Sequence, residues 1–157
     1  MTTEKDRDNL IYAIIVRCYE QEQNIRNSLD SKAYNIIGIS GILSAFIIAV
    51  TTAFYSQTHY QLIFLLPFIP LLSSAILGLF AYQIKCYNAI DPQRFINEYK
   101  DKDYETTLRR YIGTIAKTTN DNGCVHKRKA KLIKYALWSL VIATTLFFVT
   151  IFVTWLI

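Results

Sequence analysis

Residues 33–55 read AYNIIGISGILSAFIIAVTTAFY, and none of them is Asp, Glu, Lys or Arg. Two more windows without these residues follow, LIFLLPFIPLLSSAILGLFAYQI at 62–84 and YALWSLVIATTLFFVTIFVTWLI at 135–157. Each window has 23 residues. An α-helix rises ~1.5 Å per residue, so ~20 residues cross a hydrocarbon core of ~30 Å. The sequence therefore predicts an all-α integral membrane protein with three transmembrane helices.

The basic residues predict how these helices are oriented. All 17 Lys and Arg lie in two segments, five in residues 1–32 and twelve in residues 85–134, while the loop at 56–61 has none. Because basic loops stay in the cytoplasm, we expect both segments there and the C-terminus at the outer face. The chain is then one unit made of a cytoplasmic helix (1–32), three spans (33–55, 62–84 and 135–157) and a cytoplasmic helical insert (85–134).

The N-terminal segment carries apolar residues at helical spacing from Glu4 to about Leu29, which predicts an amphipathic helix. No Pro or Gly separates it from the first span, so we expect the two to be nearly continuous. The second span contains Pro67 and Pro70. Proline removes a backbone hydrogen bond from a helix, so this pair predicts a kink.

The insert is expected to hold two helices before the third span. Asp91-Pro92 is typical of a helix start, an N-cap acceptor followed by proline, and this helix should reach about Lys100. A second helix is predicted at 104–117. The run Asn120-Asp-Asn-Gly123 predicts a turn, after which a basic helix from Val125 should enter the third span.

Small residues recur every four positions in the first span, at Gly41, Ala45, Ala49 and Ala53. Such a stripe lets two membrane helices approach closely. It fits packing within the hairpin of the first two spans, and it also fits an interface between subunits.

Catalytic and metal-binding patterns do not stand out. The two histidines, His59 and His126, fall on opposite sides of the predicted membrane, and no P-loop, GxGxxG or GxSxG motif occurs. Cys124-Val-His126 offers two metal ligands without a second pair. We expect neither enzymatic activity nor a cofactor or metal.

Basic and aromatic residues are interleaved on the insert, as a ligand with a phosphate and a base requires. The candidate nucleotide-binding residues are Arg94, Tyr99, Arg109, Arg110, Lys127 and Arg128. The densest basic cluster, at 127–134, also fits a simpler role as an anchor on anionic lipid headgroups.

The predicted spans contain no Asp, Glu, Lys, Arg or His, and three neutral helices are too few to enclose an ion path. If ions cross, a homo-oligomer must form the pore, lined by hydroxyls, small residues or a hydrophobic gate. The candidate pore-lining residues are Ser40, Ser44, Thr51, Thr144, Thr150 and Thr154. Alternatively, these hydroxyls bond back to carbonyls of their own helix.

Three segments resemble the SLATT family of bacterial membrane effectors: the helix at 15–26 with Arg17, Tyr19 and Asn24, the start of the first span at 35–42 with Gly38 and Gly41, and the stretch at 104–111. The resemblance covers about residues 10–111, and the third span departs from the simplest two-span pattern of the family.

The resemblance implies an anti-phage effector in the bacterial inner membrane. Such an effector forms a pore under control of a nucleotide or oligonucleotide from a companion nucleotidyltransferase, and its activation depolarises the membrane and stops growth. The expected partners are therefore membrane lipid, the nucleotide and further copies of the chain, with a tetramer as our working assumption. The alternative is a small non-conducting scaffold that recruits a protein through its cytoplasmic helices.

Overall fold

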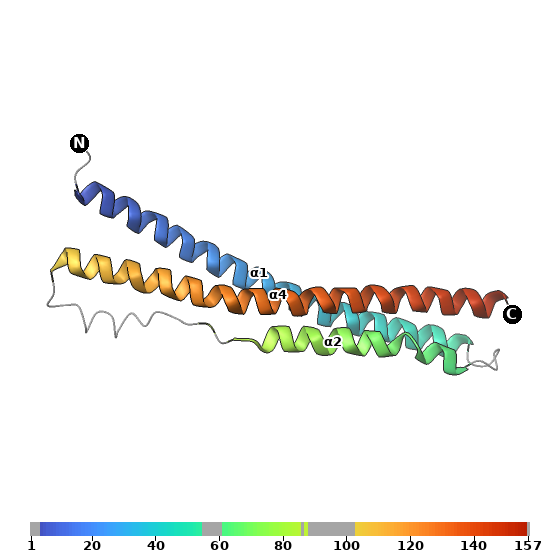
Figure 1. The fold of residues 1–157 in the computed structure, drawn as a ribbon. Coiled ribbons are helices and arrows are strands. Elements are labelled where there is room, and N and C mark those ends of the chain that lie inside the picture. The colour runs from blue at the N-terminus through green and yellow to red at the C-terminus, as the bar shows by residue number, and fades with distance from the viewer. Residues whose placement is uncertain (1–3, 55–60, 86, 88–102, 157) are drawn as a thin grey trace. The chain divides into compact units, whose positions relative to one another are not determined.

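A computed structural model describes residues 4–54, 61–85, 87 and 103–156 of the chain (Figure 1). Within these ranges every regular element is a helix. The elements are α1 (Glu4–Phe54), the 3₁₀ helix η1 (Gln61–Leu65), α2 (Phe68–Gln83) and α4 (Tyr104–Leu156). Three helical stretches are long and apolar enough to cross a membrane, within Tyr12–Ala53, Ile63–Gln83 and Glu105–Leu156. The predicted all-α fold with three membrane-length helices is confirmed, while the orientation stays a prediction.

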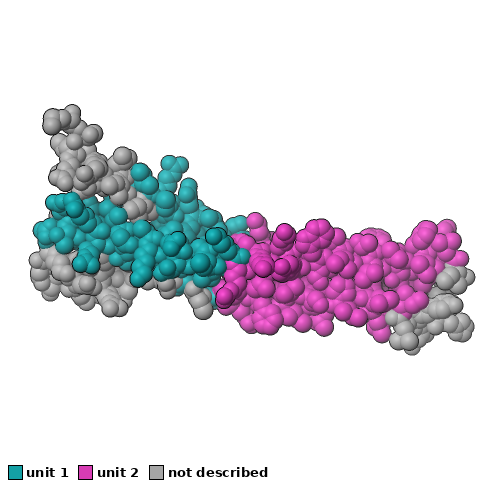
Figure 2. Space-filling view, viewed as in Figure 1, with its two compact units in different colours: residues 1–28, 85–127 teal, residues 29–84, 128–157 magenta. Residues whose placement is uncertain are grey.

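The described chain forms two compact units (Figure 2). The first unit comprises residues 1–28 and 85–127, and the second comprises residues 29–84 and 128–157. Helices α1 and α4 each contribute residues to both units. Helix α1 is 51 residues long and α4 is 53 residues long. The predicted continuity of the N-terminal helix with the first span is confirmed, because α1 is a single helix.

The predicted turn at residues 120–123 is wrong, because α4 continues through these residues as one helix. Asn122 is buried, and its side-chain amide donates a hydrogen bond of 2.9 Å to the carboxylate of Glu22 on α1. This bond to another helix favours the helical backbone at residues whose intrinsic helix propensity is low. The helix predicted from Asp91 to Lys100 lies outside the described residues.

The two prolines of the second span begin a helix where we expected them to bend one. The window at 62–84 starts as η1, and α2 begins only at Phe68. Pro67 occupies the N-cap with φ −65°, and Pro70 lies in the first turn of α2. First-turn amides have no partner within the helix, so proline costs no hydrogen bond there. The prolines therefore set the start of α2.

The core of the second unit joins α1, α2 and α4. One apolar cluster contains Ala33, Ile36, Ala81, Ile133 and Ala136, and another contains Ile47, Leu71, Ala143 and Phe147. Two hydroxyls also connect the helices: Ser74 donates to the carbonyl of Ala136 over 2.8 Å, and Ser139 to that of Pro70 over 2.7 Å. These bonds satisfy polar groups that would otherwise face an apolar medium.

The close approach of α1 and α2 occurs at Gly78. A Cβ atom at this position would lie 3.1 Å from Cγ1 of Ile37 and 3.6 Å from the carbonyl oxygen of Ala33. The small-residue stripe of the first span lies elsewhere, since Gly41, Ala45, Ala49 and Ala53 are all exposed. Packing within the hairpin, one of the two expected roles of this stripe, is therefore not what the structure shows.

We predict that Gly78→Leu destabilises the second unit by about 1–3 kcal/mol, because the added side chain would overpack the contact with α1. Gly38→Leu is the matched control, since nothing lies within 4 Å of a Cβ at Gly38. The free energy of unfolding, measured by titrating detergent-solubilised protein with SDS, should fall only for Gly78→Leu. Equal losses in both variants would contradict the assigned close approach.

Candidate functional site

A groove with three basic side chains runs along α4 in the first unit. Its volume is ≈ 690 Å³. Most of the lining residues recur at spacings of three or four, so they share one face of the helix. The lining consists of Tyr87 and of Arg109, Arg110, Gly113, Thr114, Lys117, Thr118 and Asp121. We call this the cationic groove, because its lining has three basic side chains and a single carboxylate.

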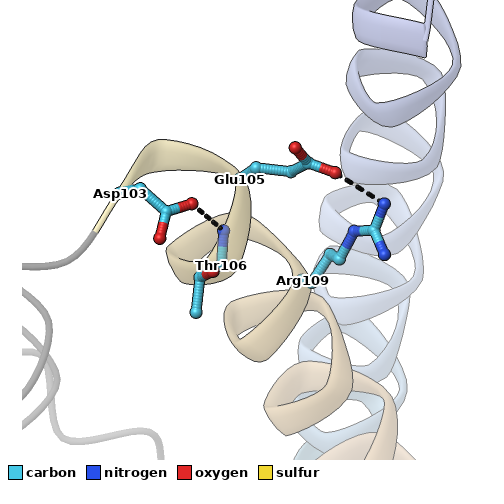
Figure 3. A network of polar contacts seen from close by, with 4 residues as sticks. All are labelled: Asp103, Glu105, Thr106 and Arg109. Carbon is cyan, nitrogen blue, oxygen red and sulfur yellow. Dashed lines mark hydrogen bonds and ion pairs between the residues drawn. The ribbon is translucent and has the colours of Figure 1, made fainter.

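The start of α4 is capped by Asp103, whose carboxylate accepts a hydrogen bond of 2.9 Å from the backbone N–H of Thr106 (Figure 3). This backbone donor is the main reason why the pKa of Asp103 lies below its ordinary value of 3.8. One turn on, an Nη atom of Arg109 lies 2.6 Å from the carboxylate of Glu105. An incoming anion must therefore compete with Glu105 for Arg109.

A buried polar cluster joins α1 to α4 within the first unit. Besides accepting from Asn122, the carboxylate oxygen Oε1 of Glu22 lies 3.4 Å from Nε2 of His126. The Glu22 side chain is only 8% exposed and that of His126 only 11%. Among the described residues, the second carboxylate oxygen of Glu22 and both ring nitrogens of His126 have no hydrogen-bond partner. A buried carboxylate is costly without donors, so this cluster depends strongly on Asn122.

Tyr87 links the buried cluster to the cationic groove. Its ring lies 4.4 Å from the guanidinium of Arg26 on α1, within the range of a cation–π interaction, and 5.2 Å from the ring of His126 on α4. The same residue lines the groove. A molecule that contacts Tyr87 in the groove would therefore also affect the surroundings of Arg26 and His126.

The structure brings together only part of the predicted nucleotide-binding set. Arg109 and Arg110 line the cationic groove, whereas Lys127 lines another groove of the first unit, together with Cys18 and Cys124. Arg128 is exposed and belongs to the second unit. The two remaining predicted residues, Arg94 and Tyr99, lie outside the described residues.

Sequence reasoning missed several groove and cluster residues. Lys117 follows Arg110 by seven positions, so helical spacing could have found it. Glu22 and Asn122 are 100 residues apart, and no local pattern signals such a contact. Lys129 was assigned to the basic cluster but is fully buried, where it pairs with Asp30.

The predicted pore-lining hydroxyls bond mainly to their own helices. Ser40 differs, since its hydroxyl lies 3.5 Å from that of Ser74 on α2. The others donate to carbonyls three or four residues earlier in the chain; they are Ser44, Thr51, Thr144, Thr150 and Thr154. This is the alternative that the sequence left open, and a role in lining a pore stays a prediction.

A comparison with known protein families matches residues 18–156 to the Pycsar effector protein domain, PycTM. Since the match covers most of the chain, including the third span, the chain belongs to this family. It is thus a multi-pass membrane effector of anti-phage defence, and the family implies a cyclic nucleotide signal. The family is one of transmembrane effectors and not a known family of enzymes. No curated protein and no solved structure matches the chain.

We predict that Asn122→Ala destabilises the first unit by about 1–3 kcal/mol, because Glu22 would lose its amide donor while remaining buried. Asn120→Ala is the matched control, since Asn120 is exposed on the same helix. Thermal unfolding and limited proteolysis of the detergent-solubilised protein should separate the two variants. Indistinguishable stabilities would show that the Glu22 cluster contributes little.

We predict that Thr106→Pro raises the pKa of Asp103 toward 3.8, because proline lacks the donating N–H. A lowered pKa means that the cap stabilises the helix start above pH 3.8, and that this stability is lost as pH falls through the lowered value. Thr106→Val, which keeps the N–H, is the control. An NMR titration of the Asp103 carboxyl carbon should give the smaller change for Thr106→Val, and the reverse order would refute the backbone cap.

Proposed function

We propose that this chain forms an oligomeric pore in the bacterial inner membrane, controlled by a cyclic nucleotide bound in the cationic groove. A companion nucleotidyltransferase would supply the nucleotide during infection. A change in pore state would then depolarise the membrane and arrest growth of the infected cell. The observation that carries this proposal is the placement of Arg110, Lys117 and Tyr87 in one groove.

The groove offers a partner for each part of a cyclic nucleotide. The phosphodiester carries one negative charge, which Arg110 can bind with two parallel hydrogen bonds and Lys117 as a point charge. The base can stack on the ring of Tyr87. The carboxylate of Asp121 can accept from a ribose hydroxyl or a base amino group. The volume of ≈ 690 Å³ also falls in the range of small-molecule sites, about 300–1,000 Å³.

The contacts of Tyr87 suggest how binding is transmitted. A nucleotide stacked on this ring would shift it relative to Arg26 on α1 and His126 on α4. Both helices also contribute residues to the second unit, which contains the three uncharged windows. To gate a pore, the ligand must bind one conformation more tightly than the other. We therefore assign the coupling to these two helices.

The proposal includes an oligomer because three neutral helices are too few to enclose an ion path, and those of one copy pack against each other. The exposed stripe from Gly41 to Ala53 supports an interface between copies, since small residues let membrane helices approach closely. In an assembly of about four copies, hydroxyls or a hydrophobic constriction would line the axis.

We predict that Arg110→Ala and Lys117→Ala each weaken cyclic nucleotide binding about tenfold or more, since a hydrogen bond to a charged group contributes ~1.5–3 kcal/mol. Lys127→Ala removes a cation from the same helix outside this groove and should bind normally. Isothermal titration calorimetry with 3′,5′-cyclic mononucleotides of all four bases measures the effect. Normal binding by both groove variants would refute the site.

The pore itself is tested by recording the ionic current across planar bilayers that contain the purified protein. The current is compared before and after adding the nucleotide that binds. Discrete currents that the nucleotide switches on or off would support a ligand-gated pore, and their direction would give the sign of gating. If inserted, oligomeric protein conducts in neither condition, the scaffold alternative is favoured.

A further inference from the structure

A third groove lies between α1 and α4 within the second unit, with a volume of ≈ 450 Å³. Helix α1 contributes Leu29 and Lys32. Helix α4 contributes the remaining lining residues, which are Ala130, Ile133, Lys134, Leu137, Trp138 and Val141. We call it the Lys32–Trp138 groove. It shares no lining residue with the cationic groove.

The two charged lining residues of this groove lie next to uncharged windows of the chain. Lys32 and Lys134, both exposed, are its two charged lining residues. Lys32 directly precedes the first uncharged window and Lys134 directly precedes the third. Trp138 follows one turn further along α4, and Val141 a turn beyond. The groove is therefore cationic where the charged segments end. Of its apolar lining, Leu29, Ala130 and Ile133 precede the lysines, while Leu137, Trp138 and Val141 lie in the third uncharged window.

We propose that the Lys32–Trp138 groove binds one anionic phospholipid molecule. The two ammonium groups pair with the headgroup phosphate, while an acyl chain lies against Leu137, Trp138 and Val141. A free phosphate compound fits the lysines but leaves the apolar lining uncovered, and a neutral hydrocarbon leaves the lysines without an anion. Lysine and tryptophan near the end of a span are also the residues that anchor proteins at the membrane interface. This site does not rest on the proposed pore function.

Only some of the neighbouring basic residues of α4 line this groove. Lys129 is fully buried and pairs with Asp30. Arg128 and Lys131 are exposed but do not line the groove, and Nζ of Lys131 lies 6.0 Å from the ring centroid of Tyr135. A diffuse attraction of all basic residues to an anionic surface would treat Arg128 and Lys131 like Lys32 and Lys134. A lipid bound in the groove would instead depend on Lys32 and Lys134, and not on Arg128 and Lys131.

Trp138 provides a reporter inside the groove. The chain has two tryptophans, so Trp155→Phe leaves Trp138 as the single fluorophore. Full-length protein is reconstituted into vesicles containing brominated phosphatidylglycerol or brominated phosphatidylcholine, whose bromine atoms quench nearby tryptophan. We expect a relative affinity at least about fivefold in favour of phosphatidylglycerol, since one basic residue near an anionic surface contributes about that factor.

Two double variants, which remove the same charge, separate a bound lipid from surface attraction. Lys32→Gln/Lys134→Gln should abolish the preference, and Arg128→Gln/Lys131→Gln should retain it. Equal quenching by the two lipids in the parent, or equal loss in both double variants, would overturn the proposal. Displacement of brominated phosphatidylglycerol by excess soluble glycerol phosphate would instead assign the lysines to a free phosphate compound.

Native mass spectrometry of the unaltered protein gives a second measurement that does not depend on how well the variants fold. Protein released from mixed micelles should retain one phosphatidylglycerol per chain in preference to phosphatidylcholine. Retention of both lipids in proportion to their abundance would overturn the proposal.

Discussion

The ammonium group of Lys129 joins all three helices of the second unit. Its side chain is fully buried on α4, pairs with Asp30 of α1, and lies 3.4 Å from the carbonyl oxygen of Ile84, which follows α2. A buried cation that loses its partner is strongly destabilising. Lys129 can contact both partners only when the three helices are aligned as they are here. In the same alignment Gly78 faces Ile37, and Ser74 donates to the carbonyl of Ala136. The apolar cluster beside the ion pair depends on the same alignment.

Polar contacts play a corresponding part in the first unit, where Asn122 and His126 face Glu22 across α1 and α4. In both units, buried polar side chains turned toward the partner helix fix its position. Exposed basic side chains line the cationic groove along α4 and the Lys32–Trp138 groove between α1 and α4. Tyr87 takes part in both kinds of contact, because it lines the cationic groove and also contacts Arg26 and His126. In the proposed function, this double role makes Tyr87 the residue that would transmit nucleotide binding to α1 and α4.

Predictions from sequence succeeded where the physical cause was local. The absence of charge over 23 residues gave each span, and the absence of Pro or Gly before residue 33 gave the continuity of α1. They failed where a distant contact or a helix end decided the outcome. The run at 120–123 has turn composition, yet the bond from Asn122 to Glu22 favours a helix there. Pro67 and Pro70 were expected within one bent helix, whereas they lie where η1 gives way to α2.

The sequence by itself determined that this protein is helical, crosses a membrane and concentrates its positive charge in two segments, because hydropathy and charge act over a few helical turns. Only the tertiary structure decided which surroundings several of the described basic residues share. Lys129 is buried in an ion pair, Arg110 and Lys117 share one groove, and Lys32 and Lys134 share another. Local sequence cannot distinguish these lysines and arginines, because their surroundings depend on which face of α4 meets α1, about one hundred residues earlier.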